Sequence, residues 1–451
     1  MPAPKPTERP QERPATPAEP PLIERPLSPT ERVLPAPPLP PRSTIEAPSG
    51  PPVAPGPTVP SVAVPAIAPG AAGLGLPATA VFEIHPGATV SGEYSDNFFQ
   101  TSGDRRDNFR TTLSPGLTLF INSPVTKGTI AGTFSLAHDT TNSDISVFYS
   151  LFGSVVWDAT PVLSLSLSDS LTRSDESSQA DRLSLRRERN TFTSNVFSAA
   201  AVYRLRSLEL RPYYTLSTFF EEGGDDTISH TVGATASLAF YSTNTLSLGY
   251  AYLDSTSSDA SDVKGHQVTA ALSRQLSRLF TAGVSAGLAL RDESGATSGL
   301  GDRFQIWNGS LFGSYTSIRF ALDASIGYSV LAADDGATYS GVSTASTLTY
   351  RFGRVTAILG VDSGYSETFT LGENFGVVPT TGATASLSYS FSPALSAAAG
   401  AFYRRNDLLG VIATEEDDRR EETWGATASV SFRLRSWLDL GLNYTYTDRK
   451  D

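Results

Sequence analysis

One pattern in the sequence is associated with covalent catalysis. The segment Gly283-Val284-Ser285-Ala286-Gly287 matches the Gly-x-Ser-x-Gly motif of serine hydrolases. In that motif the serine sits on a sharp strand-to-helix turn, and a histidine activates it. Here the serine lies inside an apolar/polar alternation from Phe280 to Leu288, which a turn would interrupt, and His266 is the only local histidine. We therefore interpret Ser285 as a small residue on the polar face of a strand and expect no enzymatic activity.

Metal and thiol chemistry have little support in the sequence. The chain has no cysteine, and its four histidines lie far apart, without the clustered spacing of a metal site: His85, His138, His230 and His266. Acidic stretches offer oxygen atoms that Ca²⁺ prefers, but none follows the EF-hand spacing. Solvated loops are the simpler interpretation of these stretches, and we expect neither a metal nor another cofactor.

The composition changes near residue 80. Of 31 prolines in the chain, 24 lie in residues 1–80, and the six acidic and six basic residues of this segment balance. Proline fixes φ and lacks an amide donor, so this density predicts a disordered, extended tail rather than helix or sheet. No apolar segment typical of a secretory signal follows Met1, so export would require a trimmed signal or a different start.

From residue 81 onward the dominant pattern is an alternation with period two. In Leu163–Ser168 every odd position is leucine and every even position is serine, and Trp424–Leu434 alternates over eleven residues. Strict alternation indicates a β-strand, because successive side chains point to opposite faces. About ten residues is also the length that crosses a bilayer at a tilt.

The connections between the predicted strands are of two kinds. Short turns such as Asp158–Pro161 and Phe352–Arg354 alternate with longer charged loops such as Ser168–Glu188 and Asp292–Asp302. Transmembrane barrels sort their connections this way, with short periplasmic turns and long extracellular loops. Aromatic residues flank the short turns, as an interfacial girdle does: Trp157, Tyr203, Tyr241, Phe391 and Trp437.

These features predict an all-β fold with two regions. Residues 1–80 form a disordered proline-rich tail, and residues 81–451 form a large antiparallel up-and-down transmembrane β-barrel of about 18–20 strands. We count nineteen strands, whereas single-chain bacterial barrels usually have an even number. Either a final C-terminal strand is missing or the count is wrong by one. A barrel this wide cannot fill its interior with side chains, so the apolar face must meet lipid and the polar face water.

The phase of the alternation assigns charged residues to the polar inner face. Charges avoid the lipid face, where arginine or lysine costs roughly 2–4 kcal/mol at the midplane. Both signs occur, so no ion preference follows. The candidates for lining the lumen are Glu209, Arg211, Arg319, Asp323, Arg351, Arg354, Asp362, Arg404, Arg433 and Asp439.

Two short stretches resemble a known family. Tyr94-Ser95-Asp96-Asn97-Phe98-Phe99, followed by an acidic loop and a strand with Pro115-Gly116, resembles the first hairpin of a family of outer-membrane β-barrel porins. Tyr444–Arg449 resembles the penultimate strand of that family, after which another strand usually follows. The resemblance covers residues 81–451 and implies an association with exopolysaccharide production and export.

Four functions remain open at this stage. The leading one is an outer-membrane channel, passive or gated, for hydrophilic solutes, with an exopolysaccharide as the solute that the resemblance favours. The alternatives are an anchoring barrel whose periplasmic tail contacts envelope proteins, a hydrolase using Ser285, and a secreted adhesin. The expected partners are outer-membrane lipid, lipopolysaccharide and, through the tail, periplasmic or cell-envelope proteins, but no nucleic acid.

Overall fold

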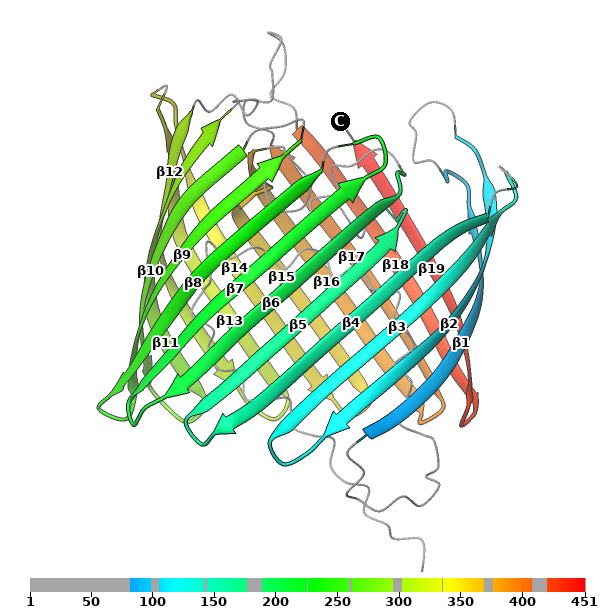
Figure 1. Cartoon of the computed structure of the whole chain (residues 1–451), viewed down its shortest axis with the longest axis horizontal. Helices are drawn as coiled ribbons and strands as arrows, with labels where there is room; N and C mark the ends of the chain where they lie inside the picture. The colour runs from blue at the N-terminus through cyan, green and yellow to red at the C-terminus, as the bar shows by residue number, and fades with distance from the viewer. Residues whose placement is uncertain are drawn as a thin grey trace, which may run out of the picture. The chain divides into compact units, whose positions relative to one another are not determined.

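The computed structural model consists of β-strands joined in one sheet that curls into a barrel (Figure 1). It describes residues 82–98, 105–141, 143, 145–176, 189–224, 226–258, 262–294, 302–334, 336–368, 376–407 and 420–450. The nineteen strands are β1 (Phe82–Ser95), β2 (Asn108–Asn122), β3 (Thr126–Asp139), β4 (Ile145–Thr160), β5 (Leu163–Ser174), β6 (Phe192–Arg204), β7 (Leu208–Glu221), β8 (Thr227–Phe240), β9 (Asn244–Ser257), β10 (Asp262–Gln275), β11 (Phe280–Ser294), β12 (Arg303–Thr316), β13 (Phe320–Ala333), β14 (Thr338–Phe352), β15 (Val355–Glu367), β16 (Val377–Ser392), β17 (Leu395–Asp407), β18 (Arg420–Arg435) and β19 (Leu438–Lys450).

Each strand pairs antiparallel with the strand that follows it in the chain. Two to four residues connect strands on one side of the barrel, the turn side, and four to seventeen on the other, the loop side. Odd-numbered strands therefore all run from the turn side to the loop side. Strands β1 and β19 are both described in full, and no backbone pairing joins them. We name this unpaired junction the seam.

The outer face carries an apolar band between two aromatic girdles. Three strands show the arrangement, with an aromatic near the loop side and another eight residues away near the turn side: Trp307 and Tyr315, Tyr328 and Phe320, and Trp424 and Phe432. Eight residues span about 26 Å along a strand, or about 20 Å along the barrel axis at the usual tilt. This spacing suits the hydrocarbon thickness that a transmembrane barrel must match.

The structure confirms the predicted fold, a large antiparallel up-and-down transmembrane barrel, and the count of nineteen strands. Two predicted starts are late: β16 begins at Val377 rather than near Thr381, and β18 at Arg420 rather than near Thr423. Both strands continue beyond the apolar band on the loop side, where the alternation no longer separates lipid from water. The predicted tail, residues 1–80, lies outside the described residues.

The buried side chains gather at the loop end of the barrel interior. Phe304, Ile306 and Leu331 are among the least exposed of the described residues, and each alternates along its strand with outward-facing neighbours such as Trp307 and Tyr328. The turn end of the interior is more open. None of the described residues forms a helix that is long and apolar enough to span a membrane.

The two faces should differ in how well they tolerate an added charge. Ala428 lies on the outer face midway between Trp424 and Phe432, and Ser429 lies on the inner face beside it. We expect Ala428→Arg to lower the free energy of unfolding by roughly 2–4 kcal/mol and Ser429→Arg to change it little. Urea unfolding of the barrel in lipid vesicles would measure this, and equal losses in both variants would contradict the face assignment.

Candidate functional site: the lumen of the barrel

Hydroxyl groups dominate the inner face of the wall. Serine pairs on neighbouring strands hydrogen-bond to each other across the sheet, at 2.7 Å for Ser114 and Ser135, 2.9 Å for Ser237 and Ser247, and 2.7 Å for Ser396 and Ser431. Such pairs satisfy each other without a charge and leave lone pairs for water. These pairs give the inner face uncharged polar positions that suit contact with water.

The Gly-x-Ser-x-Gly segment is part of this wall and has no catalytic geometry. Ser285 lies within β11, without a turn, and its hydroxyl is 2.7 Å from that of Ser310 on β12. The ring of His266 lies on the outer face, where its Nδ1 is 2.8 Å from the Tyr250 hydroxyl. The serine and the histidine face opposite sides of the sheet, so they cannot form a nucleophile and base pair.

Most of the charged residues predicted for the lumen lie at the turn end. Glu209 pairs with Arg204 at 3.5 Å, and Arg433 pairs with Asp439 at 3.1 Å, in both cases across neighbouring strands. By their phase Arg211, Asp323 and Arg351 also lie on the inner face near the turns.

Arg319 departs from the expectation that it faces the lumen. It lies in the turn before β13, and its guanidinium is 5.5 Å from the ring of Phe352, an exposed residue of the outer aromatic girdle. Attraction between the cation and the ring faces it outward, towards the level of the lipid headgroups.

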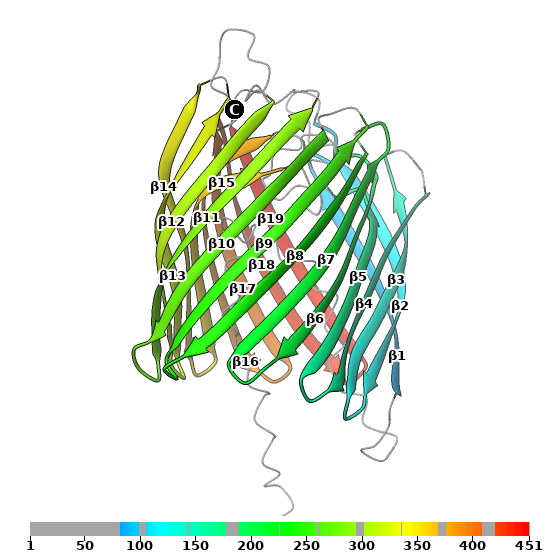
Figure 2. The same cartoon turned by 60° about the vertical axis from the view of Figure 1, so that its left-hand side comes forward.

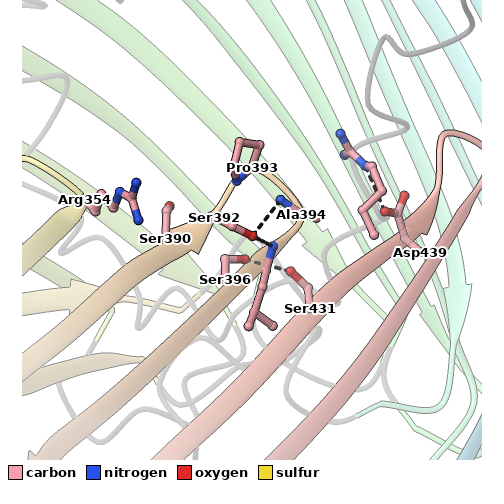
Figure 3. A pocket seen from close by; sticks show the side chains of 10 residues that line it. Arg354, Ser390, Ser392, Pro393, Ala394, Ser396, Ser431 and Asp439 are labelled. Carbon is pink, nitrogen blue, oxygen red and sulfur yellow. Dashed lines mark hydrogen bonds and ion pairs between the residues drawn. The ribbon is translucent and has the colours of Figure 1, made fainter.

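A hollow of about 450 Å³ lies at the turn end of β16, β17, β18 and β19 (Figure 3). Four serines line it together with two arginines and one aspartate: Ser390, Ser392, Ser396, Ser431, Arg354, Arg433 and Asp439. A guanidinium nitrogen of Arg354 donates to the carbonyl of Phe391, which holds that side chain against the wall. The hollow offers both charges and several hydroxyls to a solute at this mouth.

Asp362 and Arg404, also predicted for the lumen, form a buried pair farther from the turns. They lie on β15 and β17, with Gly382 of β16 between them in the pairing register. The carboxylate and guanidinium come within 3.8 Å because Gly382 has no side chain, and a Cβ there would lie 2.6 Å from Asp362 Oδ1. The glycine thus provides the space for an ion pair that reaches across a whole strand.

A second ionic cluster, not singled out from the sequence, closes part of the loop end. Arg110 of β2 bonds Asp139 of β3 at 2.8 Å and Asp175, which follows β5, at 2.6 Å. Arg189 bonds Asp175 at 3.2 Å, and both guanidinium groups lie over the ring of Phe98. Asp175 belongs to a loop interpreted from the sequence as solvated, and that interpretation is wrong for this residue because two arginines bury it.

The loop end of the β15–β16 hairpin folds inward across the lumen (Figure 2). Val377 at the start of β16 packs in one cluster with residues of β10 to β13, namely Val263, Ala289, Phe304, Ile306 and Leu331. Glu367 at the end of β15 bonds Arg291 of β11 at 2.8 Å. These strands are four positions apart around the wall, about 19 Å at the usual spacing, so only an inward bend permits this contact.

We call residues 365–368 and 376–378 the hairpin end. The Thr368 amide and hydroxyl both donate to the Gly376 carbonyl at 3.0 Å, which fixes its two arms together. The Arg291–Glu367 pair and the apolar cluster then hold it against the wall. Arg291 and Glu367 were not among the residues assigned to the lumen from the sequence, and no signal in the sequence links them.

Comparisons with known proteins were made by sequence and by structure. No protein-family model matches the sequence, and no curated protein matches it. Among solved structures, the siderophore receptor PirA from Pseudomonas aeruginosa has 13% identity and a TM-score of 0.46, covering 81% of this chain and 71% of its own. The FrpB iron transporter from Neisseria meningitidis has 12% identity and a TM-score of 0.46, covering 81% of both chains. OccK9 from Pseudomonas aeruginosa has 13% identity and a TM-score of 0.38, covering 82% and 94%. These values assign neither a family nor an activity.

The ionic cluster predicts a specific pH dependence of stability. Burial by itself raises the pKa of the Asp175 carboxyl, but the hydrogen bonds and charges of Arg110 and Arg189 outweigh it and hold the pKa below its ordinary value. The cluster's contribution is then present above the unfolded pKa of about 3.9 and is lost as the pH falls through the lower folded value.

We expect Asp175→Asn to lower stability by roughly 1.5–3 kcal/mol at neutral pH, because a hydrogen-bonded charge is removed beside two buried arginines. The difference between the parent and the variant should stay constant from pH 8 to about 5 and shrink below about pH 4. This stability difference is measured at each pH by thermal unfolding in detergent, followed through the gel mobility shift of heated samples. A difference that grows as the pH falls would contradict the assignment.

Proposed function

We propose that the chain is a bacterial outer-membrane channel for hydrophilic solutes, gated at its loop end. The observation that carries the proposal is the contrast between the two faces of one wall. The outer face is an apolar band bounded by aromatic girdles, and the inner face is lined by serine hydroxyls and paired charges. This arrangement suits a lipid exterior and an aqueous interior.

The number of strands supports an open bore at the turn end. Barrels of 16–18 strands leave an aqueous channel, and wider ones hold a plug. With nineteen strands this barrel lies between those classes. The lumen-facing rings of Tyr213 and Phe402 lie against glycines of the neighbouring strand, Gly233 and Gly425, and so remain close to the wall.

The hairpin end is the candidate gate. It lies inside the lumen, and among the residues that the structure describes the Arg291–Glu367 ion pair and an apolar cluster attach it to the wall. A gate requires that such a segment exchange between an attached and a released state. The ionic cluster around Arg110 lies at the same end and narrows the opening further.

The charges at the turn-side mouth favour an anionic solute. Among the described residues near the turns, leaving out Arg274 and Arg319 on the outer face, the acidic ones are Glu83, Asp158, Glu209, Asp323 and Asp439, and the basic ones are Lys127, Arg204, Arg206, Arg211, Arg278, Arg351, Arg354, Arg433 and Arg435. A basic mouth concentrates anions before they enter. With the turn side in the periplasm, an acidic exopolysaccharide leaving the cell is the solute that we propose.

An anchoring barrel, with the tail bound to a periplasmic partner, is the competing function. It needs no conducting lumen, so measurement of conduction separates the two.

We expect the barrel, purified in detergent and inserted in a planar bilayer, to give discrete current steps with anion preference in a salt gradient. The steps report an aqueous lumen, and the preference reports the basic mouth. Removing residues 1–77 should leave the steps unchanged. Silence from folded barrels, shown to be folded by their gel mobility shift on heating, would favour the anchoring function.

The gate predicts a response to loss of one charge. Glu367→Gln keeps the size of the side chain but removes the ion pair that holds the hairpin end. We expect the ratio of open to closed time to rise about tenfold or more, since tenfold corresponds to only about 1.4 kcal/mol. Single-channel recording measures this ratio.

Asp292→Asn is the matched control for Glu367→Gln. Asp292 bonds Arg303 at the same 2.8 Å and the same end of the barrel, but both side chains are exposed. An exposed pair contributes little, so gating should not change. Equal effects of the two variants would rule out the hairpin end as the gate.

A further inference from the structure

The wall has a gap at its loop end between β14 and β17. Strand β14 pairs with β13 from Thr338 to Tyr350, but it pairs with β15 only from Thr344 onward. Residues 338–343 of β14 therefore have no strand partner on the β15 side among the described residues. Strand β16 likewise pairs with β17 only from Thr380 onward. The hairpin end, which would fill this gap, lies inside the lumen, and the gap is about 14 Å wide, or three strand spacings.

The gap begins at the level of the loop-side aromatic girdle. Val342 of β14 is the register partner of Tyr328, an exposed aromatic of that girdle. Beside it, a Cβ on Gly341 would have no heavy atom of the described residues within 4 Å, so this part of β14 has free space around it. From this level towards the loops, water and lipid headgroups can hydrogen-bond the unpaired peptide groups, which the hydrocarbon could not do. The wall can therefore open here without exposing its backbone to hydrocarbon.

The hairpin end has its outward side turned to the inner surface of the wall. The outward positions of β15 are odd-numbered, as the exposed side chain of Leu359 shows. Tyr365 and Glu367 continue this series, yet Glu367 bonds Arg291 on the inner face of β11. Tyr365 and Val377, the register partner of Glu367, pack with the apolar cluster of β10 to β13. The inner wall thus covers the side of the hairpin end that would face outward if β15 and β16 ran straight.

The existing register defines where the hairpin end would fit in the wall. The ladder of β14 and β15 ends at the pair Thr344–Ser363. Continuing this ladder places Tyr365 opposite Val342, in line with the loop-side girdle, where an amphipathic ring is favoured. Glu367 then lies beyond the girdle, at the level of water and headgroups. No side chain of the hairpin end would be placed against its preference in this position.

We propose that the hairpin end exchanges between the lumen and the gap in the wall, so that one movement closes the gap and removes the hairpin end from the bore. Its effect on conduction rests on the proposed channel function, whereas the exchange itself does not. In the lumen, the apolar cluster and Arg291 cover the outward side of the hairpin end. In the gap, lipid and headgroups cover the same side, and the free edge of β14 gains backbone hydrogen bonds. Each position satisfies the same segment, which is the condition for two states.

Disulfide trapping tests the position in the wall, and the absence of cysteine from the chain makes every introduced cysteine unambiguous. The trap pair is Gly341→Cys with Ser366→Cys, which become register partners when the ladder of β14 and β15 is continued. Neither substitution touches the ion pair or the apolar cluster that holds the hairpin end. The control pair is Thr349→Cys with Ile358→Cys, register partners on the same two strands and the same face. On oxidation of the folded barrel in lipid vesicles, both pairs should form a disulfide, the trap pair more slowly because its cysteines meet only when the hairpin end enters the gap.

The rate of trapping should depend on the ion pair that holds the hairpin end in the lumen. Glu367→Gln, added to the trap pair, should raise this rate about tenfold or more, the same factor as its expected effect on the ratio of open to closed time. Asp292→Asn, which removes an exposed pair with Arg303, should leave the rate unchanged. In a planar bilayer, oxidised barrels with the trap pair should stay open until a reductant is added.

The proposal would be overturned if the trap pair formed no disulfide in barrels whose control pair reacts fully. A trapping rate that Glu367→Gln does not change would also overturn it, as would trapped barrels that open and close as before. Barrels that show the expected trapping rates but carry no current would refute the channel function and confirm the exchange of the hairpin end.

Discussion

Backbone hydrogen bonding is the constraint on which this structure depends. Inside a bilayer no peptide group can turn to water, so every strand needs a partner on each edge. The chain meets this requirement at every edge except the two at the seam, because each strand pairs with its successor over most of its length. This backbone pairing does not depend on the side chains. The alternation along each strand then places the side chains on a face towards lipid or a face towards water.

Inside the barrel, side chains occupy the space that the paired strands leave open. Long side chains reach across strands where a glycine leaves room, as Arg404 reaches Asp362 over Gly382. The rings of Tyr213 and Phe402 lie against glycines of the neighbouring strands, which keeps them close to the wall. At the loop end the strands extend past the apolar band, and there charges and apolar residues pack together and narrow the lumen.

The sequence was sufficient to predict the wall because its signal is local. A period of two over Leu163–Ser168 or Trp424–Leu434 depends only on the residues themselves, and strand starts such as Thr126, Phe280 and Val355 agree with the structure. The inner-face phase of Asp362 and Arg404 followed from the same signal, but their pairing across Gly382 did not. Contacts such as Arg291–Glu367 and Arg110–Asp175 join residues 76 and 65 positions apart, and they exist only because the wall curves and a hairpin bends inward. Arg319 was assigned to the lumen by phase, although it belongs to a turn where phase has no meaning.

The most direct test of the account is the accessibility of single cysteines along β18 in lipid vesicles. Thr427, Ser429 and Ser431 face the lumen, and Ala426, Ala428 and Val430 face outward. A water-soluble maleimide present on both sides of the membrane should label the first set and spare the second, giving a period of two. Uniform labelling, or labelling of the outward set, would contradict a lipid-facing exterior around an aqueous lumen.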